Sequence, residues 1–226
     1  MDHFNEEYLQ RKSEIENYLN LLKLLDQDGI KITSLDDADG TTIPGNAFQV
    51  AKASFYLVLY NLAEATINAG VQSIYNRISD ENLSFSEIIE PIQKVWWIQH
   101  HEKLSNCSKN QLVDNIFSLY KSCINTAIPP DFKGFVAGIS GSIDAEGVRK
   151  VCHKYGINTI GDGRELELVK KNRNWLSHGN KSFREVGQDV VLSDLEVVRN
   201  KTFEFMDGFV TNITDYLSAK RYKNTG

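Results

Sequence analysis

The chain has 226 residues, of which 41% are hydrophobic, and a formal net charge of −5. This length allows one large domain or two small ones with a full core, and we favour a single domain over residues 1–226. The acidic balance argues against a protein that coats nucleic acid without selectivity, although it does not exclude local basic patches.

The cysteines and the apolar runs indicate where the protein resides. Cys107, Cys123 and Cys152 are widely separated and show no Cys-x-x-Cys spacing, which fits a reducing compartment. The longest purely apolar run, residues 55–60, is far shorter than the roughly 20 residues that a membrane span requires. The acidic start over residues 1–7 does not resemble a signal peptide. We therefore expect a cytoplasmic protein without a membrane anchor.

The first segments of the chain predict a helix and then a loop. Apolar residues recur at helical spacing over about 4–26, whereas about 30–46 carries proline and glycine and is expected to be a loop. The acidic run 35–40 within it invites comparison with a calcium-binding loop. Its register places Leu35 and Asn46 where acidic ligands belong, so a solvated acidic loop is favoured.

A long apolar stripe without proline predicts one buried helix from about 47 to 78. Within it Glu64 lies among small neighbours, which is an unusual place for a carboxylate that has no partner. Two interpretations stay open at this point. Glu64 is either a surface residue or an acceptor that holds Arg173 or His178 in place.

The middle of the chain predicts two further helices. Residues 84–87, Ser-Phe-Ser-Glu, form a capping-box pattern that opens a helix to about Leu104, with Pro91 as a candidate kink. A second helix is expected over 109–126. The proline- and glycine-rich residues 128–143 interrupt the helical pattern, and no Gly-Lys-Ser/Thr follows that would indicate a phosphate-binding loop.

The predicted helix that ends near Leu104 contains paired tryptophans and paired histidines. His100 and His101 point about 100° apart on a helix and no third ligand is evident nearby, so we expect no metal site. Trp96 or Trp97 is expected in the core or in a subunit contact rather than as a base-stacking platform.

The last third of the chain is again helical. Helices are predicted over 145–155 and 165–177, each followed by a glycine that favours helix termination. A loop is expected over 179–192, and a capping-box pattern over 193–196 opens a final helix to about Lys220. The sequence therefore predicts an all-α protein with one irregular loop region.

Three residues of the helix over 165–177 and its end are candidates for phosphodiester cleavage. The guanidinium of Arg173 is suited to hold the charge of a pentavalent phosphorane, and the amide of Asn174 is suited to orient an oxygen. Histidine titrates near neutral pH, so His178 is the candidate for moving a proton.

The surroundings of these candidates are basic. Between Arg164 and Arg184 six Lys or Arg residues stand against two glutamates. A polyanion such as RNA requires a local cationic surplus of this kind. Lys170, Lys171 and Lys181 are the candidates for RNA binding.

Helical spacing limits how the candidates meet. Asn174 and His178 are four residues apart and share a face, whereas Arg173 and His178 are five apart and lie roughly 140° around an ideal helix. Two solutions exist. Either His178 lies in a loosened last turn beside Gly179, or a second copy of the helix completes the site across a two-fold axis.

An arginine followed by a polar residue, three more residues and a histidine at a helix end resembles the Arg-x(4–6)-His signature of the HEPN superfamily (higher eukaryotes and prokaryotes nucleotide-binding domains). The blocks 54–66, 140–145 and 173–187 resemble its bacterial branch, which is encoded beside restriction and other defence systems. Together they extend the resemblance over about 5–218 and leave a short basic tail, 219–226.

The resemblance implies a HEPN-like helical bundle with extra peripheral helices that forms a homodimer. It implies a metal-independent endoribonuclease of a defence or toxin-type system, without a cofactor, in which Arg173, Asn174 and His178 line a cleft between subunits. Glu64 is not part of the family motif. Asn180 stands where some HEPN toxins carry a tyrosine that a partner enzyme modifies, which puts that control in doubt. An antitoxin of another kind or a restriction-system protein is then the expected protein partner.

Other interpretations of the same residues stay open. Arg173 and His178 can be purely structural, through an ion pair and a helix end respectively. A HEPN module can also bind RNA or a nucleotide without cutting it. A third interpretation is an interaction subunit that docks onto a restriction or toxin complex through Trp96 and Trp97.

Overall fold

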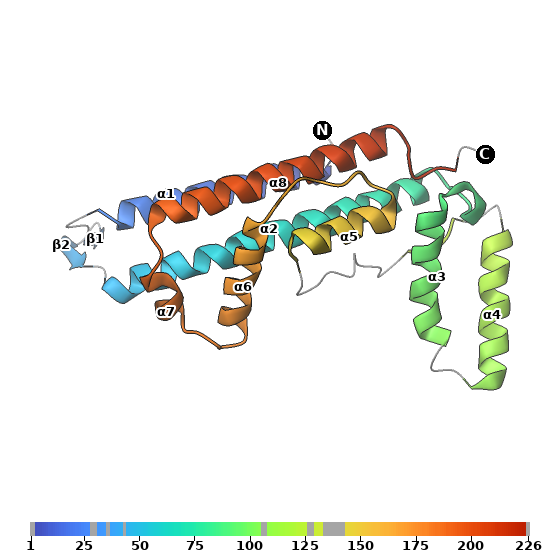
Figure 1. Cartoon of the computed structure of the whole chain (residues 1–226), viewed down its shortest axis with the longest axis horizontal. Coiled ribbons are helices and arrows are strands. Elements are labelled where there is room, and N and C mark those ends of the chain that lie inside the picture. The colour runs from blue at the N-terminus through green and yellow to red at the C-terminus, as the bar shows by residue number, and fades with distance from the viewer. Residues whose placement is uncertain are drawn as a thin grey trace. The chain divides into compact units, whose positions relative to one another are not determined.

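The computed structural model describes residues 3–27, 31–34, 37–42, 44–104, 108–125, 129–132 and 143–224. These residues are mainly helical, which confirms the all-α fold expected from the sequence (Figure 1). The α-helices, in chain order, are α1 (His3–Leu25), α2 (Gly45–Asp80), α3 (Glu90–Leu104), α4 (Lys109–Ile124), α5 (Ala145–Tyr155), α6 (Glu165–Ser177), α7 (Phe183–Gln188) and α8 (Leu192–Ser218).

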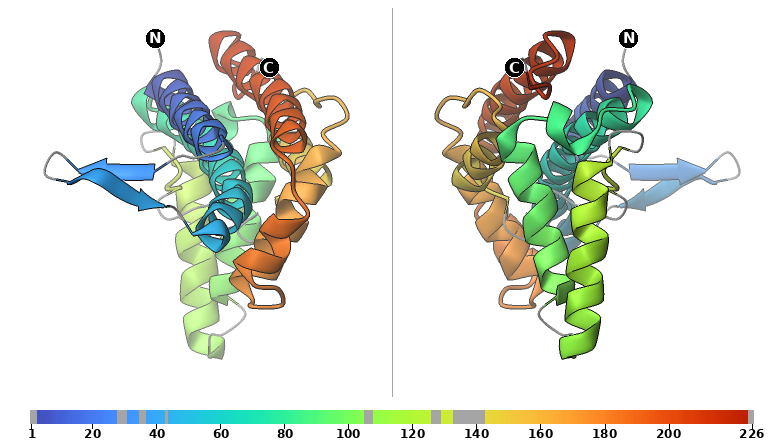
Figure 2. Two further views of the ribbon diagram at one scale, coloured as in Figure 1. Left: turned by 90° about the vertical axis from the view of Figure 1, so that its left-hand side faces the viewer. Right: turned by 90° about the vertical axis from the view of Figure 1, so that its right-hand side faces the viewer.

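A small hairpin occupies the segment for which we expected only a loop. Strands β1 (Lys31–Ser34) and β2 (Asp37–Thr42) pair antiparallel and extend away from α1 and the start of α2 (Figure 2). β-branched residues such as Ile32 and Thr41, which face each other in the register, favour strand pairing over a loop. The expectation of a structureless loop was therefore wrong. Part of the acidic run and most of the irregular region 128–143 lie outside the described residues.

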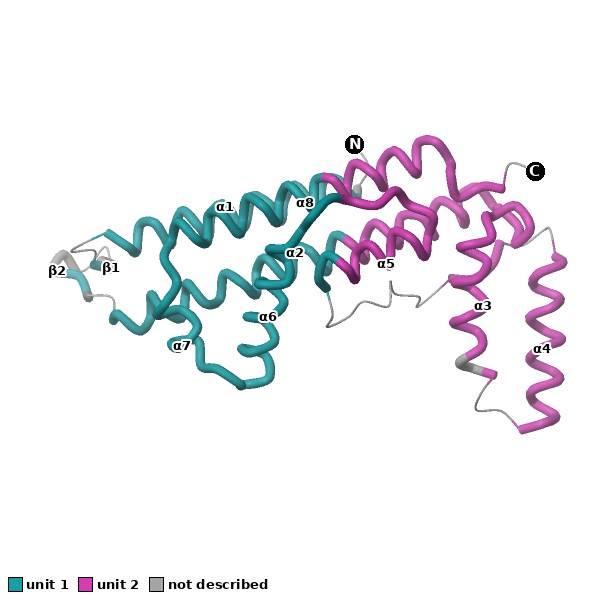
Figure 3. Tube along the Cα trace, viewed as in Figure 1, with its two compact units in different colours: residues 1–66, 142–145, 161–207 teal, residues 67–141, 146–160, 208–226 magenta. Residues whose placement is uncertain are grey.

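The chain divides into two compact units, each built from separate stretches of sequence (Figure 3). Unit 1 comprises residues 1–66, 142–145 and 161–207, and unit 2 comprises residues 67–141, 146–160 and 208–226. Helices α2, α5 and α8 contribute residues to both units, because the boundaries fall within them; for α5 only Ala145 belongs to unit 1. The expectation of a single domain stays a prediction.

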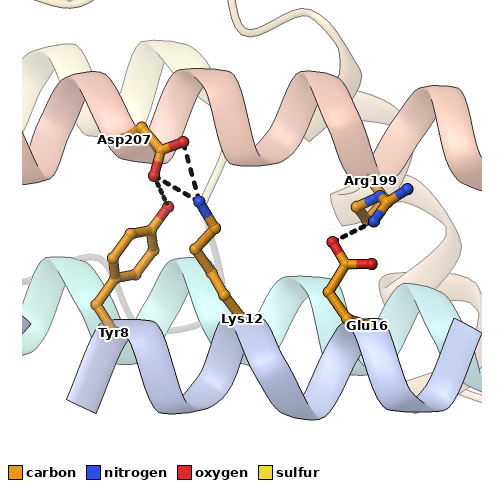
Figure 4. A network of polar contacts seen from close by, with 5 residues as sticks. All are labelled: Tyr8, Lys12, Glu16, Arg199 and Asp207. Atoms are coloured by element: carbon orange, nitrogen blue, oxygen red, sulfur yellow. Dashed lines mark hydrogen bonds and ion pairs between the residues drawn. The ribbon is translucent and has the colours of Figure 1, made fainter. Parts of the chain in front are cut away.

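In unit 1, polar contacts tie α1 to the first part of α8 at two points (Figure 4). The Tyr8 hydroxyl and the Lys12 ammonium both donate to Asp207 Oδ1, at 2.7 and 2.8 Å, and Arg199 pairs with Glu16. Burial raises the pKa of Tyr8, and the hydrogen bond to the Asp207 carboxylate raises it further. These contacts accompany a buried apolar stripe on α1 that includes Ile15, Leu19 and Leu22.

Helix α7 was not expected, because its residues fall in the predicted loop over 179–192. A capping box forms there: the Ser182 N–H donates to Glu185 Oε2 at 2.7 Å, and the Glu185 N–H donates to Ser182 Oγ at 3.2 Å. Gly187 lies against the backbone of Gln49, so close that an added Cβ would be 1.9 Å from the Gln49 carbonyl oxygen. The capping sequence was therefore a usable signal, and glycine permits the close approach.

In unit 2, the predicted capping box over 84–87 forms but does not open the long helix. The Ser84 N–H donates to Glu87 Oε2 at 2.9 Å and caps a single 3₁₀ turn, Phe85–Glu87. Helix α3 begins separately at Glu90. Pro91 lies in its first turn, where a missing N–H costs no helical hydrogen bond, so the kink expected at Pro91 was wrong.

Residues 220–224 of the basic segment contact the rest of unit 2, and residues 225 and 226 lie outside the described residues. In unit 2 the buried Tyr222 donates to Glu81 Oε1 at 2.8 Å, and Lys220 and Lys223 form ion pairs with the same carboxylate. Contacts with Lys223, Lys220 and Tyr222, in that order, lower the pKa of Glu81 to about 2.

Within the described part of the chain, no helix is long and apolar enough to cross a membrane.

Candidate functional site

Helix α6 carries the candidate residues, and its bounds agree with those predicted from the sequence. Its end is fixed by Gly179, which has φ of +68°. The Asn180 N–H donates to the Trp175 carbonyl at 2.9 Å and the Gly179 N–H donates to the Leu176 carbonyl at 3.3 Å. This pair of bonds is the Schellman motif that ends helices at glycine. The helix therefore stops immediately after the candidate histidine.

Arg173 is half-buried and is held by two neighbours in unit 1. Its guanidinium carbon lies 4.6 Å from the centroid of the Tyr60 ring on α2, and its Nη1 donates to Asn174 Oδ1 at 3.1 Å. Tyr60 is itself fixed, because it is buried and its hydroxyl accepts the Ile143 N–H at 3.3 Å. A guanidinium carries five N–H donors, and the only hydrogen bond that the Arg173 guanidinium forms within the described residues is the one to Asn174.

His178 is the last-turn residue and its side chain is exposed. Its φ and ψ of −97° and 1° depart from helical values, while its N–H still donates to the Asn174 carbonyl at 3.0 Å. His178 therefore lies in a loosened last turn, which is one of the two arrangements considered above for bringing Arg173 and His178 together. In the described part of the chain no hydrogen bond joins the His178 ring to Arg173 or Asn174. One copy does not assemble the three residues into a hydrogen-bonded triad.

The three candidate lysines differ in their contacts. Lys170 is tied to Asp144 by an ion pair of 2.6 Å in which both side chains are largely covered, at 27% and 21% exposed. Lys171 and Lys181 are exposed, and their ammonium groups lie 4.7 and 3.9 Å from the centroid of the Trp175 ring. Lys170 therefore anchors α6 within unit 1, whereas Lys171 and Lys181 present charge to solvent.

Comparison with protein families identifies the chain. The model of the HEPN_MAE_28990-like HEPN family matches residues 2–222, which is nearly the whole length. The chain belongs to this HEPN family. Neither the curated proteins nor the solved structures gave a match. The match confirms the resemblance to the HEPN superfamily that the Arg-x(4–6)-His pattern and the blocks 54–66, 140–145 and 173–187 indicated. Membership indicates a function related to nucleotides or RNA, and HEPN domains are often ribonucleases and often dimerise.

The candidate residue Arg173 is contacted by a residue to which the sequence assigned no role. Tyr60 precedes Glu64 by one helical turn on α2, and it is Tyr60 that contacts Arg173. Glu64 is half-buried, and within the described ranges it forms no ion pair or hydrogen bond with Arg173 or His178. The holding role that we considered for Glu64 is filled in one copy by Tyr60 and Asn174. In the sequence, Tyr60 lies with Asn61 and Glu64 around one turn of the long predicted helix and within the block 54–66, but nothing there linked it to Arg173.

The chemistry available to this candidate site is that of a guanidinium and an exposed imidazole, with two exposed lysines beside them. Arg173 presents a planar set of donors that suits two phosphate oxygens at once. His178 is accessible to a bound molecule. Among the described residues, no group of three or more His, Cys, Asp or Glu side chains is arranged to hold a metal ion.

Proposed function

We propose that the protein is a metal-independent endoribonuclease whose active site is shared by two copies of the chain. The observation that carries the proposal is the placement of Arg173 on the Tyr60 ring, with His178 exposed at the end of the same helix. The membership of a HEPN family supports RNA as the substrate. The reaction is transesterification: the 2′-hydroxyl of RNA attacks the adjacent phosphate, and the products carry a 2′,3′-cyclic phosphate and a 5′-hydroxyl.

Arg173 is the electrostatic residue in this mechanism. The Tyr60 ring and the Asn174 amide fix the plane of the guanidinium before substrate binds. The remaining N–H groups then stabilise the charge that develops on the equatorial phosphate oxygens. A fixed donor needs no reorganisation during the reaction, which is why such groups contribute strongly to rate.

His178 is the proton-transfer residue. In the forward step it removes the proton of the 2′-hydroxyl or protonates the leaving 5′-oxygen, and such assistance contributes about a hundred- to ten-thousandfold to the rate. Its exposure leaves room for both the RNA strand and a second protein copy.

The spacing of the motif favours a composite site. Arg173 and His178 are five residues apart, and no hydrogen bond joins their side chains in the described part of one copy. A two-fold axis beside α6 brings His178 of one copy to Arg173 of the other. The homodimer therefore supplies the convergence that one helix does not.

Lys171 and Lys181 bind phosphates that flank the scissile bond in this proposal. Both are exposed and both lie beside Trp175 on the segment that carries the motif. Lys170 is a weaker candidate than the sequence indicated, because Asp144 already holds its ammonium. By resemblance, we place the enzyme in a bacterial defence or toxin-type system, in which an antitoxin or a restriction-system protein restrains it.

A HEPN module that binds RNA without cutting it is the second candidate. It is favoured by one observation: no hydrogen bond from a described residue fixes the tautomer of the His178 ring, as a general base usually requires. In the composite site the second copy or the substrate provides that contact. The two candidates differ in whether products form.

End-group analysis of cleaved RNA tests the proposed function. Wild-type protein is expected to yield 2′,3′-cyclic phosphate and 5′-hydroxyl ends in the presence of EDTA, whereas His178→Ala and Arg173→Ala yield none. A substrate with a single 2′-deoxy nucleotide at the cleaved position is expected to resist cleavage there. Retention of RNA on a filter without products at any protein concentration would establish the binding module instead.

A further inference from the structure

Helix α4 in unit 2 presents its apolar residues to solvent. No residue of this helix is buried, although its sequence is amphipathic. The exposed side chains share one feature, a fractional exposure close to or above one half: Val113 66%, Ile116 48%, Phe117 57%, Tyr120 55% and Ile124 57%. A helix with this composition normally buries such residues against a neighbour.

The five side chains form one stripe on the helix. Their spacing of three, one, three and four residues places them on a single face. Helix α3 runs antiparallel to α4 (Figure 1), and a cavity of about 460 Å³ is lined by Trp96 and His100 of α3 together with Ser118, Leu119, Lys121 and Ser122 of α4. Lys121 lies at the border between this cavity and the apolar residues, because its ammonium is 4.6 Å from the centroid of the Phe117 ring. Ser122 lies about half a turn from the stripe. The apolar face therefore points away from α3.

We propose that this α4 stripe, Val113–Ile124, is a self-association surface on which two copies of the chain pair their α4 helices antiparallel. The stripe exposes on the order of 500 Å² of apolar surface, which is near the upper end of what monomeric proteins leave uncovered. Pairing two such stripes buries at most about 1,000 Å² in total, which is close to the lower limit for a specific interface. The inference does not depend on the proposed nuclease activity.

The charges on α4 specify the antiparallel direction. Between Asn110 and Ile124 the charged residues are Asp114 and Lys121, which lie almost symmetrically about the middle of the stripe. Antiparallel pairing places Asp114 beside the partner's Lys121, and this contact occurs twice by symmetry. The pairing that sets Phe117 opposite the partner's Tyr120 and Val113 opposite the partner's Ile124 leaves Asp114 two residues, about 3 Å along the helix axis, from the position opposite the partner's Lys121, and the long lysine side chain spans that offset. Parallel pairing would instead place Asp114 beside the partner's Asp114 and Lys121 beside the partner's Lys121, and these like charges would repel.

The mass of the assembly in solution tests the surface. Phe117→Glu places a carboxylate at the centre of the stripe and is expected to weaken the association by about thirtyfold or more, as replacement of a central hot-spot residue does. Light scattering across a concentration series is then expected to show a smaller assembly for Phe117→Glu than for wild type, which is the α6-paired dimer if the proposed shared active site also forms. Val197→Glu is the matched control, because Val197 on α8 is 56% exposed and lies outside the stripe. Equal masses for wild type and Phe117→Glu, with the helical circular dichroism unchanged, would overturn the proposal.

Disulfide formation tests the direction of pairing. Val113→Cys and Ile124→Cys are prepared as separate proteins in a background with Cys107→Ser and Cys123→Ser. Mixed and oxidised, they are expected to form a disulfide between the two variants. Each alone is expected to remain unlinked, because antiparallel pairing separates equivalent positions by about 16 Å along the helix axis at 1.5 Å per residue. Absence of the mixed disulfide would overturn the antiparallel pair. If Phe117→Glu also has the same assembly mass as wild type, the stripe is not a self-association surface.

Discussion

The guanidinium carbon of Arg173 lies 4.6 Å from the centroid of the Tyr60 ring, so α2 supplies the surface on which the motif arginine of α6 rests. Neither the helical period nor the motif spacing indicates this contact, because the two residues are 113 positions apart. The contact holds one face of the guanidinium against the ring, and in the proposed mechanism its remaining N–H groups bind the substrate.

Replacement of Tyr60 separates the role of its ring from that of its hydroxyl. Tyr60→Phe keeps the surface beneath Arg173 and removes only the acceptor for the Ile143 N–H, so we expect RNA cleavage close to wild type. Tyr60→Leu removes the cation–π contact, which contributes about 1–2 kcal/mol when partly buried, and is expected to lower kcat about tenfold. Single-turnover cleavage rates measure the difference, and thermal unfolding of both variants controls for a change in stability. Equal rates for the two variants would show that the ring has no positioning role.

Arg173→Lys tests whether geometry or charge matters at the motif arginine. Lysine keeps the positive charge but presents a point ammonium in place of the planar fork that stacks on Tyr60. We expect kcat to fall about a hundredfold or more, as for removal of one transition-state donor, with a smaller change in KM. Full activity of Arg173→Lys would mean that a simple cation suffices.

The lysines beside the motif divide into two classes in a salt titration. Lys171→Ala and Lys181→Ala each remove an exposed cation, so the slope of log K against log salt for single-stranded RNA is expected to fall by about 0.7 for each phosphate that the variant no longer binds. Lys170→Ala is the matched comparison. It removes the ion pair with Asp144 and is expected to destabilise the fold by about 1–2 kcal/mol while leaving the salt slope unchanged. Denaturant unfolding and RNA binding measured on all three variants check the division.

The Glu81 cluster predicts a pH dependence of stability. Its carboxylate has a folded pKa of about 2, against about 4.3 for an unfolded glutamate, because Lys223, Lys220 and Tyr222 contact it. A lowered folded pKa means that this contribution is fully present above about pH 5 and is lost as the pH falls from about 4 towards 2. Wild type is therefore expected to be more stable than Glu81→Gln at pH 7, and the difference in melting temperature is expected to shrink below pH 4.

The Glu81 measurement is a comparison between two proteins because other carboxylates also titrate in this range. Their effects are common to wild type and Glu81→Gln and cancel in the difference. A difference in melting temperature that stays constant from pH 7 to pH 3 would contradict the assigned contacts.

Local patterns in the sequence predicted the elements that local physics determines. Helices α5 and α6 have the predicted bounds, since an apolar stripe and a terminating glycine are both encoded within a dozen residues. Helix α7 was missed although Ser182 and Glu185 form a capping box, because its six residues are too few to show a helical period. The contacts around Glu81 were missed because they join segments far apart in the chain.

For the candidate site, too, the sequence predicted the residues of one helix and missed those that contact it from elsewhere in the chain. Arg173, Asn174 and His178 were found from their types and spacing on one helix, and the structure places Arg173 and Asn174 in contact. Tyr60 and Asp144 support that helix from elsewhere in the chain, and only tertiary structure brings them to it. Gly179 predicted that α6 ends beside His178, and the structure shows that the His178 side chain is exposed there.

Complementation between two inactive variants tests the shared site most directly. Arg173→Ala and His178→Ala are mixed at equal concentrations under conditions that allow subunit exchange, and RNA cleavage is compared with each variant alone. If Arg173 of one copy acts with His178 of the other, half of the dimers are mixed and each has one intact site, so the mixture is expected to recover about a quarter of wild-type activity. Demonstrated subunit exchange without any recovery of cleavage would contradict a site built from two copies.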